Sequence, residues 1–237
     1  MKRNTLLAGL FAGAALLGAV ATAVAEPRNL VVVELFTSQG CSSCPPADEL
    51  LTRMAARDDV LPLALHVDYW DYIGWADSFA RPEHTKRQKA YAHVAGSRTI
   101  YTPQMIVSGD EQIVGTRPME LADAIMKHAA SGPIARVSAE RDGDRLQVVV
   151  PAVTLPGGTA VLQLVRFMPE KTVRIDRGEN QGKTISYSNI VTAWDVVGEW
   201  SGEADLVAEV PVPGPEAAAV ILQAAGHGRI LGAARVD

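Results

Sequence analysis

The sequence predicts an α/β domain followed by a smaller all-β, sandwich-like domain. Three observations predict it. The apolar run Val31–Phe36 leads through a short turn into a helical pattern and a second apolar run, which is a β-α-β arrangement. Ser131-Gly132-Pro133 then breaks the helical pattern, and the rest of the chain consists of short apolar runs between glycine- and proline-containing turns. We therefore expect an α/β domain over residues 26–132 and a β-rich domain over residues 133–237.

Residues 1–25 have the pattern of a secretory signal peptide. Lys2-Arg3 is a charged start, Leu6–Val20 is apolar, and Ala23-Val24-Ala25 is a small-residue cleavage site. The apolar stretch is short for a membrane span, and no other segment approaches its length. We expect cleavage and a periplasmic or secreted protein without a membrane span; an uncleaved N-terminal anchor is the alternative.

Composition limits the classes of partner. The 237 residues carry a net charge of −5, which argues against nucleic acid or an anionic membrane surface as a partner. Two cysteines are present, in a chain expected to enter a compartment where disulfides persist.

Local patterns place the elements of the first half. Ala47–Arg57 puts its apolar residues on one helical face, and prolines are tolerated in the first turn just before it. The functional turn of a β-α-β unit lies at the carboxyl end of its first strand, where the cysteines are found. The further elements expected here are a strand at Leu61–Asp68, a helix at Arg81–Ala95, strands at Gln104–Val107 and Gln112–Val114, and a helix from Pro118.

The second half predicts strands separated by turn signals. The candidates are Leu146–Val150, Ala160–Phe167, Ile185–Val197, Ala204–Val210 and Ala218–Gln223. Between two of them lies a polar loop with Arg174, Asp176, Arg177, Glu179 and Asn180. This loop is interpreted as a binding loop or a solvated turn.

Cys41 and Cys44 form a C-x-x-C motif between a strand and a helix. A thiol at a helix N-terminus has a stabilised thiolate, and a second thiol one turn along can close on it as a disulfide. A redox-active pair is the first interpretation. A stabilising disulfide is the second, although so short a loop gains only about 2 kcal/mol from closure. A zinc site is the third, but it needs further ligands that do not stand out.

The order of elements, with Thr102-Pro103 before a strand, resembles the thioredoxin-like superfamily over about residues 30–130. The segments Cys41–Asp48, Val67–Asp71 and Tyr101–Met105 are similar to those of a family of secreted bacterial proteins with a thioredoxin-like domain and no assigned function. The resemblance implies a thioredoxin-like α/β domain. It also implies a cis Thr102–Pro103 bond, with Pro103 against the disulfide and backbone groups beside it free for an extended substrate.

Each candidate residue has a role. Cys41 is expected to be the exposed nucleophile and Cys44 the resolving thiol. Glu34 matches the position near which thioredoxins keep a buried carboxylate, and it would serve Cys44 as acid and base; a surface ion pair is its alternative. His66 and Asp68 share a strand face and could bind metal or tune the site, and a hydrogen-bonded histidine is the favoured interpretation.

Two further segments have open interpretations. The aromatic residues between Tyr69 and Phe79 could form a partner surface or fill the core. The basic stretch Arg81–Lys89 is interpreted as a solvated helix face. Gly40 stands where thioredoxins usually carry an aromatic residue.

Three functions follow from these patterns. The first is an enzyme, a thiol–disulfide oxidoreductase that needs no bound cofactor or metal and exchanges electrons with protein thiols, protein disulfides or a redox partner protein. The second is a non-catalytic binding or assembly module. The third is a copper-handling protein, because thiolates bind Cu(I).

Overall fold

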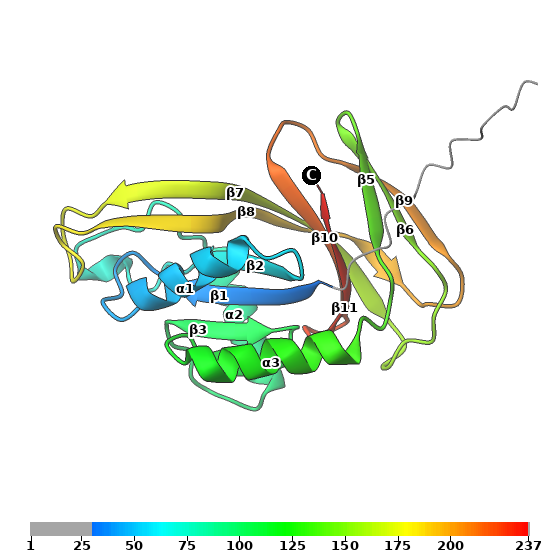
Figure 1. Cartoon of the computed structure of the whole chain (residues 1–237), viewed down its shortest axis with the longest axis horizontal. Coiled ribbons are helices and arrows are strands. Elements are labelled where there is room, and N and C mark those ends of the chain that lie inside the picture. Colours follow the sequence, from blue (N-terminus) through cyan, green and yellow to red (C-terminus); the bar gives the residue numbers. More distant parts are fainter. Residues whose placement is uncertain (1–29, 237) are drawn as a thin grey trace, which may run out of the picture.

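The computed structural model describes residues 30–236, and its main feature is one large mixed sheet (Figure 1). The eight strands follow the order β11-β10-β7-β8-β2-β1-β3-β4, and a second sheet has the order β5-β6-β9. The predicted signal peptide lies outside the described residues. Between residues 30 and 236, no helix is long and apolar enough to cross a membrane. The helical elements are α1 (Pro45–Ala55), the 3-10 turn η1 (Asp71–Ile73), α2 (Pro82–Val94) and α3 (Pro118–Ser131).

The strands lie close to the ranges that the sequence predicts, with two additions. They are β1 (Val31–Thr37), β2 (Val60–His66), β3 (Gln104–Val107), β4 (Glu111–Val114), β5 (Ser138–Asp142), β6 (Arg145–Val150), β7 (Ala160–Arg174), β8 (Thr184–Trp200), β9 (Leu206–Pro211), β10 (Ala217–Ala224) and β11 (Ile230–Val236). The sequence analysis missed β5 and β11.

The first half of the chain positions the cysteines at one end of β1. β1 pairs with β2 in parallel and with β3 in antiparallel orientation. Every residue of β1 and β2 is buried, as expected for strands covered on both faces. Helices α1 and α3 pack on one face of β1, through Leu51 and Leu121 among others. Tyr91 of α2 packs on the other face, so the turn after β1 leads into α1 on the first face.

The predicted fold class, a thioredoxin-like α/β domain followed by a smaller all-β domain, is wrong. The second half does not form a separate sandwich. It supplies four strands of the same sheet, because β8 lies beside β2 through the pair Ala64 and Ile190, and β7 and β10 continue outward. Strand β7 continues seven residues beyond its predicted end at Phe167, so that β7 and β8 form a hairpin with strands of 15 and 17 residues. Its length lets one end join β10 and the other reach the cysteine turn (Figure 1).

The small sheet packs against the outer strands of the large one. β6 alternates buried and exposed residues, and Leu146, Val148 and Val150 form a core with residues of β7, β10 and β11. The backbone joins the halves here as well, since the N–H groups of Ile134 and Ala135 both donate to the carbonyl oxygen of Leu231. The apolar contacts therefore continue from one half of the chain to the other.

A buried polar network also joins the two halves. Arg87 of α2 makes two hydrogen bonds to the Glu34 carboxylate, at 2.6 and 2.9 Å, and stacks 3.7 Å from the Trp194 ring centroid on β8. Gln223 of β10 accepts a hydrogen bond from Arg87 and donates one to the Tyr91 hydroxyl. The interpretation of the α2 stretch as a solvated face is therefore wrong for Arg87, whose side chain is 8% exposed.

Candidate functional site

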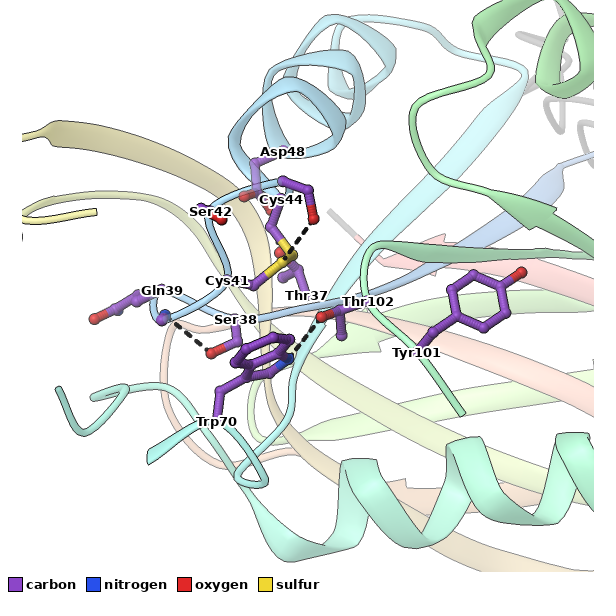
Figure 2. The surroundings of a disulfide bond; sticks show 12 residues. Thr37, Ser38, Gln39, Cys41, Ser42, Cys44, Asp48, Trp70, Tyr101 and Thr102 are labelled. Atoms are coloured by element: carbon purple, nitrogen blue, oxygen red, sulfur yellow. Dashed lines mark hydrogen bonds between the residues drawn. A yellow bond between two sulfur atoms is a disulfide. The ribbon is translucent and has the colours of Figure 1, made fainter. Parts of the chain in front are cut away.

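Cys41 and Cys44 form a disulfide at the start of α1 (Figure 2). Their Cα atoms lie 5.4 Å apart. Cys44 is the N-cap residue of α1, and its carbonyl oxygen accepts the N–H groups of Ala47 and Asp48. Pro45 begins the helix, where its missing N–H costs nothing. A sulfur leaving as a thiolate at Cys44 would therefore lie at the positive end of the helix dipole.

The disulfide is completely enclosed. Both cysteines have 0% exposure, so the expectation that Cys41 is the exposed member of the pair is wrong. The expectation rested on the first cysteine of such a turn usually being the exposed one. Here other segments of the chain lie over that turn.

The Thr102–Pro103 bond is cis, which confirms the prediction. The Trp70 indole donates a 2.7 Å hydrogen bond to the Thr102 hydroxyl beside the disulfide (Figure 2). Pro103 lies against the start of α1, because a Cβ placed on Gly115 would lie 2.9 Å from the Pro103 Cβ and 3.1 Å from the Ala47 Cβ. The proline loop and the first turn of α1 therefore meet at this end of the sheet.

A carboxylate that the sequence analysis did not select lies beside the cysteines. Asp48 follows Cys44 by four residues, so both side chains lie on one face of α1, and Figure 2 shows them together. Asp48 is buried, the Thr37 hydroxyl donates a 2.8 Å hydrogen bond to its Oδ1, and its Oδ2 has no hydrogen-bond partner among the described residues. Burial raises the pKa of Asp48 to about 7, although His66 and the Thr37 hydroxyl act to lower it.

Glu34 has a different environment from the one expected. Its carboxylate is 0% exposed and is held by Arg87 and by the Tyr91 hydroxyl at 2.6 Å. Along β1 it shares a face with Val32 and Phe36, which pack toward α2, and not with the residues beneath α1. The helical spacing of Cys44 and Asp48 was the signal in the sequence that could have identified the nearer carboxylate.

His66 takes part in a second buried pair. Its Nδ1 donates to the Asp77 Oδ2 at 2.7 Å, while its Nε2 has no partner among the described residues. Burial raises the pKa of Asp77, but His66 and two backbone N–H donors outweigh it, so this pKa is lowered. Asp68 lies elsewhere and accepts a hydrogen bond from Thr85. The favoured interpretation of a hydrogen-bonded histidine is confirmed.

The aromatic segment covers one side of the cysteine turn. The Trp75 indole donates to the Gln39 side chain at 2.8 Å, and a Cβ on Gly40 would lie within 3.3 Å of Trp70 and Ile73. The side chain of Tyr72 is 84% exposed and does not pack over the cysteine turn. A side chain at Gly40 would therefore press closely against this segment.

The polar loop between β7 and β8 covers another side. Asn180 is 1% exposed and donates to the carbonyl oxygens of Gln39 and Cys41. Glu179 accepts the N–H of Ser42 at 3.2 Å. The interpretation of this loop as a solvated turn is therefore wrong for Asn180.

One group among residues 30–236 has the composition of a metal site, and it is not at the cysteines. Asp110, Glu111 and His128 have ligand atoms within 4.8 Å of one another. Lys127 bonds to Glu111, and Arg229 lies 3.9 Å from Asp110, so the acidic charges face cations of the protein itself.

Sequence comparison matches residues 32–223 to the family described as "Protein of unknown function (DUF1223)". The chain belongs to this family. The crystal structure of protein AGR_C_4864 from Agrobacterium tumefaciens is 36% identical to this DUF1223 chain, with a TM-score of 0.74, over 86% of this chain and 92% of that one. HBP35 of Porphyromonas gingivalis is similar in fold alone, at 15% identity and a TM-score of 0.61, over 88% of this chain and 74% of that one. No curated protein matches the sequence.

Proposed function

We propose that this DUF1223 protein is an exported thiol–disulfide oxidoreductase that acts through Cys41 and Cys44. The observation that carries the proposal is the disulfide at the N-terminus of α1 with the buried Asp48 carboxyl on the same helical face. A working couple needs a stabilised thiolate and a group that exchanges a proton with it, and these two features supply both.

The exchange proceeds in two steps, and each step forms one S–S bond and breaks another. A substrate thiolate attacks Cys41, a new disulfide forms between substrate and Cys41, and the bond to Cys44 breaks. Cys44 leaves as a thiolate and takes a proton from Asp48. The second thiol of the substrate then loses its proton to solvent and attacks the substrate sulfur of the mixed disulfide. The bond to Cys41 breaks, and Cys41 leaves as a thiolate that takes a proton from solvent, so the substrate becomes a disulfide and the protein a dithiol. The reverse sequence reduces a substrate disulfide.

Substitution of the two cysteines separates their roles. In the reduced Cys44→Ser variant, Cys41 is expected to attack substrate disulfides and remain attached, because no thiol resolves the intermediate. Cys41→Ser is expected to trap few mixed disulfides or none. The measurement is the yield of disulfide-linked adducts on non-reducing gels, with a small disulfide-containing protein as substrate. Equal adduct yields from the two variants would contradict the assignment.

The equilibrium potential of the couple separates a working disulfide from a stabilising one. Structural disulfides have potentials below about −300 mV, and we expect this couple above that value. Equilibration with glutathione at several ratios measures it. A value below about −300 mV would leave the binding or assembly module as the better function, and the complete burial of both sulfurs is the observation that favours that second candidate.

A further inference from the structure

The turn that carries Cys41 is bonded to a loop that lies far away in the sequence. Residues 175–183 form the tip of the β7–β8 hairpin, beyond the last strand pair of Arg174 and Thr184. The Asn180 Nδ2 donates to the carbonyl oxygen of Gln39 at 2.9 Å and to that of Cys41 at 2.8 Å. A single buried amide therefore bonds to the backbone on both sides of Gly40.

The neighbours of Asn180 hold the same turn. Lys183 donates from its Nζ to the Asn180 Oδ1 at 2.8 Å, so that the amide has partners at both ends. Glu179 accepts the N–H of Ser42. Gly178 has a φ of +75°, and a Cβ there would lie 3.2 Å from the Trp75 Cβ. The tip thus contacts both the cysteine turn and the aromatic segment that covers its other side.

We propose that the hairpin tip, residues 175–183, is a removable cover that determines which thiols reach the disulfide, with Asn180 as its latch. Exchange requires a thiolate to contact a sulfur atom, and neither cysteine has any exposed surface while the tip is in place. This inference rests on the proposed function only in treating the disulfide as reactive. It makes Asn180 a residue that determines specificity and not a participant in the chemistry.

The tip is the part of the cover that opens most easily. Its charged residues Asp176 and Arg177 are exposed, and Ile175 is its buried apolar side chain. Opening exchanges a few hydrogen bonds for bonds to water, each with a net value of about 1 kcal/mol, and exposing Ile175 would add roughly 2 kcal/mol. The aromatic segment is held more firmly, because Phe79 packs against the rings of His66 and Tyr187. Local opening at the tip therefore costs much less than global unfolding.

The contacts of Asn180 define the chemistry of a partner that replaces it. Opening leaves the carbonyl oxygens of Gln39 and Cys41 to water in place of the Asn180 amide, and a partner that displaces this water must supply hydrogen-bond donors of its own. Main-chain N–H groups of an extended polypeptide are donors of this kind. We therefore assign an extended segment of a protein thiol as the substrate class that the open site accepts and the closed site excludes.

The rate of chemical reduction tests the cover. Dithiothreitol reduces the disulfide to two thiols and is itself oxidised to its cyclic disulfide, and trapping of the new thiols with iodoacetamide follows the reaction. Asn180→Asp keeps the size of the side chain, removes both N–H donors and places a carboxylate against two carbonyl oxygens. We expect the full chain with this change to be reduced at least about tenfold faster than the wild type, since about 1.4 kcal/mol of latch energy corresponds to tenfold.

Two further variants keep the test independent of a folding defect. Lys183→Met removes the support of Asn180 from its other end and is expected to accelerate reduction to a smaller extent. Arg177→Ala changes an exposed residue of the same tip and is expected to leave the rate within about twofold. The urea unfolding curve of each oxidised variant accompanies the rates. An acceleration matched by an equal loss of global stability would overturn the cover, because reduction would then proceed from the unfolded chain.

The outcomes distinguish this inference from the proposed function. Equal reduction rates for the wild type and Asn180→Asp would overturn the cover, whatever the potential of the couple. Faster reduction of Asn180→Asp together with a potential below about −300 mV would support the cover and contradict the oxidoreductase.

Discussion

Replacing Arg87 with methionine is expected to lower the free energy of unfolding by roughly 3–5 kcal/mol. The substitution leaves the Glu34 carboxylate buried at 0% exposure with the Tyr91 hydroxyl as its remaining partner. Uncompensated buried charge is among the costliest single defects in a folded protein. Methionine keeps the length of the aliphatic stem but removes the guanidinium that stacks on the Trp194 ring, so the loss reports the missing charge, donors and ring contact. Urea unfolding at neutral pH measures it.

Two controls separate this effect from a general sensitivity to substitution. Arg53→Met breaks an ion pair of 2.7 Å with Glu49, but both side chains are more than half exposed, and the expected loss is about 0.5 kcal/mol or less. The double variant Glu34→Gln, Arg87→Met removes the charge together with its partner and should recover part of the loss. A double variant as unstable as the sum of the two single variants would contradict the argument, because the coupling between the residues would be zero.

Replacing Asp48 with asparagine is expected to raise the free energy of unfolding relative to the wild type, and this difference should increase with pH. The pKa of Asp48 is raised to about 7 in the folded protein, against 3.8 for an ordinary aspartate. Between these values the folded state binds more protons than the unfolded state, so the ionisation of Asp48 lowers stability with rising pH. Asparagine removes this penalty, which reaches on the order of 4 kcal/mol above pH 7. The Thr37 hydroxyl can still donate to the new amide oxygen.

The test compares urea unfolding of the wild type and Asp48→Asn at pH 4, 6 and 8. The stability difference should be smallest at pH 4 and should grow by about 1.4 kcal/mol per pH unit in between. His66, Asp77 and Tyr187 surround Asp48 and are present in both proteins, so the difference isolates the titration of Asp48. Glu49→Gln, at the exposed neighbour, controls for the removal of a carboxylate from the same helix. A constant difference for Asp48→Asn would rule out the raised pKa.

Local signals predicted most elements of the fold, and long-range pairing explains what they missed. Apolar runs located β1, β2 and β3 because these strands are buried on both faces and read as continuous apolar segments. The break at Ser131-Gly132-Pro133 marked the end of α3 correctly. It did not mark a separate small domain, because the pairing of β8 with β2 depends on contacts between residues more than one hundred positions apart. No local pattern carries that information.

The candidate site also combines features that local sequence predicts with features that depend on long-range contacts. The C-x-x-C spacing identified the disulfide, and the Thr-Pro sequence identified the cis bond, because each depends on adjacent residues. The identity of the nearby carboxylate could not be obtained from the strand position of Glu34, since successive residues of a strand face opposite sides and a shift of one residue changes the face. Nor could the burial of Asn180 be obtained from a loop whose composition is typical of a surface turn.

Because the chain is synthesised from its N-terminus, the sequence separation between the cysteines and Asn180 corresponds to a delay between their synthesis. Asn180 follows Cys41 by 139 residues, and a ribosome adds about 5–20 residues per second. Each new molecule therefore passes through an interval on the order of ten seconds in which its two thiols have been made and this hairpin has not. A reagent that meets the chain before this hairpin has formed meets the cysteines without the hairpin over them, whereas the same reagent meets the finished protein with its disulfide enclosed.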